Sequence, residues 1–114
     1  MATIKSFTDI SQSKKLAEIL PLESADMYYR EWKRMTKDIR IAHVGSAGEK
    51  DLPCWSLAAL LGVLPEGWSS VLTKSFNGED YYCKLDGEPI ETMADNPVDA
   101  CYEMIIRLNE LKML

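Results

Sequence analysis

The stretch that decides the fold is PCWSLAALLGVL, residues 53–64, which begins at Pro53 and is followed directly by Pro65. It has no polar residue after Ser56, so we expect the rest of the chain to cover it on every side. Proline is tolerated in the first turn of a helix and is common just past its end. The pattern therefore predicts a buried helix at residues 54–63.

The chain after this stretch predicts antiparallel strands. Residues 71–76 and 81–85 flank Asn77-Gly78, a pair that tolerates positive φ and suits the tight turn of a hairpin. Alternation places three side chains of the second strand on one face: Tyr81, Cys83 and Leu85. A third, weaker strand is expected through residues 89–93.

Helices are predicted at both ends of the chain. Near the C-terminal end, Asn96 is the expected cap of a helix that has Pro97 in its first turn. The apolar stripe of that helix consists of Val98, Cys101, Met104, Ile105, Leu108 and Leu111. Near the N-terminal end, Ser11 or Ser13 is expected to cap a helix over residues 11–20.

Two interpretations of residues 26–44 stay open. Alternation of Tyr28, Arg30 and Trp32, together with the aromatic content, favours a strand that pairs with residues 40–44 as a hairpin. A helical spacing of three and four also fits, through Ala25, Tyr28, Trp32 and Met35. We take the hairpin as the working prediction.

Together these elements predict an α+β fold in a single domain, residues 1–114. We expect an antiparallel sheet of two hairpins, with four to five strands, to pack against the buried central helix and the amphipathic C-terminal helix. Apolar residues make up 46% of the chain and charged residues 27%, which is ordinary for a soluble globular protein.

The cysteines point to a reducing compartment. Cys54, Cys83 and Cys101 are odd in number, widely spaced and without a CxxC pair, so we expect free thiols and no metal or cofactor. No apolar run follows Lys5, as a signal peptide would require, and no apolar stretch reaches the ~20 residues that span a bilayer. The expected location is the cytoplasm, with no membrane contact.

The net charge of −5 is unevenly distributed. Residues 30–40 carry five basic and two acidic side chains, whereas residues 41–114 carry five basic and twelve acidic ones. General nucleic-acid binders favour net positive charge, because neutralising phosphates supplies most of their non-specific affinity. Only residues 30–40 could serve in that way.

No motif provides a convincing catalytic set. Cys54 and His43, the only histidine, could form a dyad with the thiol activated at the start of the central helix, but cysteine is also among the most often buried residues. Residues 45–50 depart from the phosphate-binding pattern GxxxxGK[ST], because Glu49 precedes the lysine. The acidic side chains of the C-terminal half are expected to be solvated: Glu79, Asp80, Asp86, Glu88, Glu91 and Asp95.

The best binding candidate is the segment YYREWKR, residues 28–34, because it interleaves aromatic and basic side chains. The expected contact surface consists of Arg30, Trp32, Arg34 and Lys37. Tyr, Trp and Arg are enriched at protein interfaces, so a protein partner is the first interpretation, and a homodimer stays open. Single-stranded nucleic acid is the alternative. A purely structural interpretation places Tyr28 and Trp32 in the core.

Four blocks of the chain resemble a group of small uncharacterised proteins encoded by bacterial prophages and mobile elements. They are FTDI at residues 7–10, LAEILP at 16–21, PCWSLAALL at 53–61 and DNPVDAC at 95–101. The resemblance implies a mobile-element setting and, since the group has no assigned activity, no catalytic residue. We therefore expect a non-enzymatic accessory protein of a phage or mobile element that binds another protein, with a cysteine-dependent enzyme using Cys54 as a further alternative.

Overall fold

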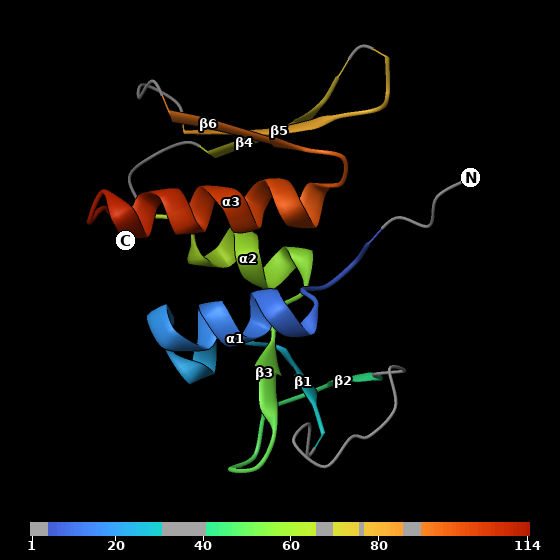
Figure 1. Ribbon diagram of the computed structural model, residues 1–114, viewed down its shortest axis with the longest axis vertical. Coiled ribbons are helices and arrows are strands. Elements are labelled where there is room, and N and C mark those ends of the chain that lie inside the picture. Colours follow the sequence, from blue (N-terminus) through green and yellow to red (C-terminus); the bar gives the residue numbers. More distant parts are fainter. Residues whose placement is uncertain (1–4, 31–40, 66–69, 76, 86–89) are drawn as a thin grey trace.

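The computed structural model describes residues 5–30, 41–65, 70–75, 77–85 and 90–114. In it, three α-helices lie between two small antiparallel sheets (Figure 1). The elements in chain order are α1 (Ile10–Ile19), the 3-10 turn η1 (Leu22–Ser24), β1 (Met27–Tyr29), β2 (Ala42–Val44), β3 (Leu52–Cys54), α2 (Leu57–Val63), β4 (Ser70–Lys74), β5 (Tyr81–Leu85), β6 (Ile90–Ala94) and α3 (Pro97–Glu110). The predicted α+β class is confirmed, but the described strands number six and form two sheets.

The sheet β4-β5-β6 confirms the predicted hairpin and its third strand. Gly78 has a φ of +76°, so the turn uses the positive φ that the Asn-Gly pair predicts. The apolar face of β5 is also as predicted, since Cys83 and Leu85 are buried. This face packs on α3.

The predicted C-terminal helix is confirmed as α3. The side chain of Asn96 accepts a hydrogen bond from the backbone N–H of Asp99 at 2.8 Å, which caps the helix. The apolar stripe is buried as expected, except that Leu111, just past the helix end, is exposed. Because α3 also contacts α2, it lies in the middle of the main core. We use this name for Leu16, Trp55, Leu60, Leu64, Cys83, Leu85, Val98, Ala100, Cys101, Met104, Ile105 and Leu108.

The central stretch differs from the prediction in two respects. Its helix, α2, begins only at Leu57, after the N-cap Ser56, and the residues before it form the edge strand β3. Pro53 fits there because it pairs with Tyr28 at a position where a backbone N–H would point away from β1. The helix is also not covered on every side. Three of its residues are exposed: Ala58, Leu61 and Gly62.

The sheet β2-β1-β3 confirms the hairpin interpretation of the described residues around 26–44 and excludes the helix for Met27–Tyr29. One face carries a second, smaller cluster, which we call the minor core: Phe7, Ile10, Met27, Tyr29, Ala42, Leu52 and Cys54. Tyr29, rather than Tyr28, is the buried tyrosine, because the inner face of β1 holds residues 27 and 29. Trp32 lies outside the described residues.

The predicted N-terminal helix exists as α1, but neither Ser11 nor Ser13 caps it. Asp9 accepts a hydrogen bond from the backbone N–H of Gln12 at 2.8 Å, and the Gln12 side chain accepts one from the Asp9 N–H at 3.1 Å. This reciprocal capping box starts the helix ahead of both serines. Ser13 is instead fully buried one turn further along.

Candidate functional site

The structure does not bring Cys54 and His43 together. His43 pairs with Tyr28 and Cys54 pairs with Met27, and neighbouring residues of a strand face opposite sides of a sheet. The thiol and the imidazole therefore lie on opposite faces, with β1 between their strands. Cys54 is fully buried in a strand rather than at a helix start, and its burial raises the pKa of the thiol. Hydrogen bonds with Thr8, Ser13 and Tyr29 act in the opposite direction, but burial outweighs them, so the pKa of the thiol stays above its usual value.

A buried polar cluster around Thr8 explains the surroundings of Cys54. The Thr8 hydroxyl lies 2.8 Å from the Ser13 hydroxyl and accepts a hydrogen bond from the Trp55 N–H at 3.1 Å. The Thr8 carbonyl accepts from the Tyr29 hydroxyl at 2.7 Å and from the Cys54 thiol at 3.4 Å. Within the described part of the chain, every buried side-chain nitrogen and oxygen has a partner. The cluster is a structural junction between β1, β3 and α1.

A second polar cluster joins the starts of α1 and α3. The Lys5 ammonium lies 2.8 Å from an Asp99 oxygen and 3.1 Å from an Asp9 oxygen, and Gln12 donates to the same Asp99 oxygen at 2.7 Å. Burial opposes ionisation of Asp99, but hydrogen bonds from Lys5, Gln12 and Asn96 outweigh it and lower the pKa of that carboxyl. The ion pair fixes the two helix starts to each other.

The acidic side chains of the C-terminal half and the loop at residues 45–50 form no metal or phosphate site among the described residues. Glu91 is paired with Lys84 at 3.2 Å across the sheet, and Asp86 and Glu88 fall outside the described residues. No group of three His, Cys, Asp or Glu side chains suited to a metal occurs in the described ranges. In the loop at residues 45–50, the Gly48 N–H donates to the Asp51 carboxylate at 2.8 Å. A carboxylate of the chain thus occupies a donor that a phosphate would use.

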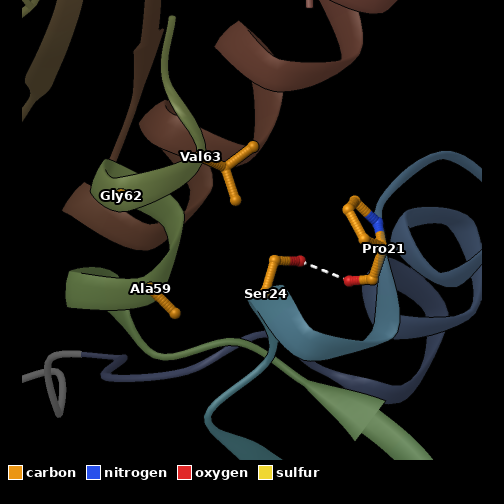
Figure 2. Close-up of a pocket in the computed structure, with 5 residues that line it drawn as sticks. All are labelled: Pro21, Ser24, Ala59, Gly62 and Val63. Atoms are coloured by element: carbon orange, nitrogen blue, oxygen red, sulfur yellow. Dashed lines mark hydrogen bonds between the residues drawn. The ribbon is translucent and has the colours of Figure 1, made fainter. Parts of the chain in front are cut away.

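An open pocket of about 390 Å³ lies between α2 and η1 (Figure 2). It is lined by Pro21, Ser24, Ala59, Gly62 and Val63. The Ser24 hydroxyl donates to the Pro21 carbonyl at 2.6 Å and accepts from the indole N–H of Trp55 at 3.0 Å. Ser24 carries the one side-chain polar group of the described lining, and that group is engaged within the protein.

Of the four predicted contact residues, only Arg30 is described, and it is exposed directly after β1. Trp32, Arg34 and Lys37 lie outside the described residues. Two large apolar side chains in and just before β2 are open to solvent: Ile41 is 62% exposed and Val44 is 85% exposed. On the outer face the rings of Tyr28 and His43 stack at 5.4 Å between centroids. We give the name β2 surface to Tyr28, Arg30, Ile41 and His43 together with Val44, which lies on the inner face of the same strand.

The backbone of β2 adds outward-facing groups that no described strand pairs with. The Gly45 N–H donates to the Asp26 carbonyl at 2.9 Å, which fixes the phase of the antiparallel ladder between β2 and β1. Because hydrogen-bonded pairs alternate along such a ladder, His43 is the next residue bonded to β1. Ala42 and Val44 then direct their N–H and C=O groups away from β1. No strand within the described ranges pairs with that side of β2.

No family model, curated protein or solved structure matches this chain. Among the described residues, no helix has the length and apolar character needed to cross a membrane. The candidate site is therefore defined by geometry alone.

Proposed function

We propose that this chain is a small, non-enzymatic accessory protein of a phage or mobile element and that it binds another protein through the β2 surface. The observation that carries the proposal is the 85% exposure of Val44 on a strand whose outer backbone groups meet no described strand. An apolar side chain and an open strand edge are both features that association with a second chain would cover.

The composition of the β2 surface supports a protein partner. Tyr28 and Arg30 belong to the residue types that dominate binding energy at interfaces, and Ile41 adds apolar area beside them. The buried thiol of Cys54 and the engaged hydroxyl of Ser24 supply no competing catalytic group. The mobile-element setting rests on the sequence blocks alone.

Position-specific crosslinking in native host cells tests this proposal. A photoreactive amino acid at Arg30 is expected to give one discrete protein adduct. The control is the same amino acid at Glu103, which is exposed on α3 and outside the β2 surface. Absence of an adduct at Arg30, or equal adducts at both positions, would contradict the proposal.

One observation favours single-stranded nucleic acid as a second candidate. The stacked rings of Tyr28 and His43 resemble a platform for a base, and Arg30 is placed to meet a phosphate. The net charge of −5 opposes this function. A fluorescence titration with oligonucleotides separates the candidates, because binding that weakens steeply with salt supports nucleic acid and absence of binding removes it.

A further inference from the structure

We infer that the partner binds by adding a strand to the outer edge of β2 and that this strand alternates apolar and acidic side chains. The inference rests on the proposed function and specifies its mode. An added strand is held by main-chain hydrogen bonds, and its alternate side chains give specificity. The outward N–H and C=O groups of Ala42 and Val44 supply two such pairing positions, on either side of His43.

The other sheet edges show why β2 is singled out. Pro53 stands in β3, and the chain just after it forms a bridge to the N-terminal segment. The edge strand β6 carries Glu91 in an ion pair, and β4 ends at the exposed Lys74. Charges and prolines are the usual means of protecting strand edges. The sequence of β2, Ala42-His43-Val44, contains neither a formal charge nor a proline.

The apolar half of the predicted pattern follows from the position of Val44. It pairs with Met27 and therefore lies on the inner face of the sheet, which the minor core covers elsewhere. Ala42, on the same face, is half-buried against that core, whereas Val44 is 85% exposed. An apolar side chain directly opposite Val44 on an added strand would continue the minor core over it.

The acidic half follows from the charges on the outer face. The residue opposite His43 would occupy the non-hydrogen-bonded position, where side chains of paired strands lie closest. A carboxylate on the added strand opposite His43 would face the imidazole. The exposed Arg30 directly follows β1, the strand on the other side of β2.

The same charges argue against a second copy of this chain as the occupant. Symmetric pairing of β2 with itself about its central residue would place His43 against His43 and offer no carboxylate to either Arg30.

A peptide titration followed by hydrogen exchange tests the inference on the full chain. The probe is a capped ten-residue peptide that alternates Val and Glu, and its control alternates Val and Lys. The acidic peptide is expected to slow exchange of the Ala42 and Val44 amides at least tenfold and to bind at least tenfold more tightly than the basic one. Equal affinity for both peptides, or unchanged exchange at Ala42 and Val44, would overturn it.

Substitution of Val44→Pro removes an outward donor without touching the ladder to β1, as Pro53 does in β3. The Val44→Pro variant is expected to bind the acidic peptide at least tenfold more weakly than the wild-type chain. Val44→Thr keeps the N–H and should change that affinity less than threefold. Val44→Asp places a like charge against the acidic strand at a side chain that is already exposed, and it should also lose binding. Wild-type affinity in both Val44→Pro and Val44→Asp would overturn the inference.

The outcome is separable from the proposed function. A partner that still crosslinks at Arg30 in the Val44→Pro variant would leave the binding function in place and overturn strand addition. A concentration-dependent dimer in sedimentation, lost in Val44→Pro, would make a second copy the occupant and likewise overturn the inference.

Discussion

The two sheets of this chain differ in how their inner faces are covered. In β4-β5-β6, Cys83 and Leu85 are at most 1% exposed, because α3 lies along the sheet (Figure 1). In β2-β1-β3 the strands have three residues each, and the inner face ends in Val44, which is open. The main core contains twelve buried residues and the minor core three, so we assign most of the stability to the former. The smaller sheet is the one that carries the proposed binding surface.

The largest expected effect comes from truncating each core. Leu108→Ala in the main core should cost about 3 kcal/mol and Leu52→Ala in the minor core about 2 kcal/mol in free energy of unfolding, because neighbours can relax more readily around the latter. Urea unfolding measures both. A larger cost for Leu52→Ala than for Leu108→Ala would contradict the assignment of most of the stability to the main core.

The next effect concerns the buried polar cluster around Thr8, the junction that connects the smaller sheet to α1. Thr8→Val keeps the shape but leaves the Trp55 N–H and the Ser13 hydroxyl without this partner. A lost partner for a buried polar group should cost about 2 kcal/mol in free energy of unfolding. Thermal unfolding, compared with the exposed control Ser11→Ala, checks this. Equal stability of the two variants would show that the junction contributes nothing.

A smaller effect, with a defined pH dependence, is expected at the ion pair between α1 and α3. Asp99→Asn should cost about 1 kcal/mol at pH 7. The folded-state pKa of Asp99 is lowered, so its contribution is complete above the unfolded value of about 3.9 and is lost as pH falls through the folded value. Urea unfolding at pH 7 and pH 2.5 should therefore show a difference that shrinks in acid. The exposed Glu103→Gln is the control, and a cost that is constant with pH would contradict the assignment.

The smallest effects concern glycines outside both cores. A Cβ at Gly62 in α2 would meet no atom within 4 Å, so Gly62→Ala should stabilise the chain by about 0.5–1 kcal/mol through helix propensity. Gly78→Ala should instead destabilise it by about 1 kcal/mol, because φ there is +76°. Melting temperatures of the two variants should move in opposite directions. A loss of stability in Gly62→Ala would show that the outer face of α2 is packed more closely than the structure has it.

Local signals predicted the larger sheet and α3 well. Asn77-Gly78 and Asn96-Pro97 are short-range turn and cap signals, and the alternation in β5 and the stripe of α3 follow directly from burial on one side. The start of α2 was missed because an apolar run does not distinguish a buried strand from a helix, and Pro53 is allowed in an edge strand as well as in a first turn. The Asp9–Gln12 capping box was a readable signal that the two serines obscured.

The candidate site was predicted only in part. Aromatic and basic residues at 28–34 pointed to the hairpin that carries the proposed surface, and Arg30 is exposed as expected. Nothing in Ala42-His43-Val44 revealed that β2 would stand at the edge of the described sheet, because strand order depends on contacts with the distant β3. The absence of a charge or proline in that strand was the one available hint.

Amide hydrogen exchange in the free protein tests the central claim most directly, namely that β2 is an open edge. The account predicts that the Ala42 and Val44 amides exchange at least tenfold faster than the His43 amide between them, while the Tyr82, Cys83 and Lys84 amides of the central strand β5 are all protected. Protection of Ala42 and Val44 equal to that of His43 would show that this edge is already covered and would contradict the account.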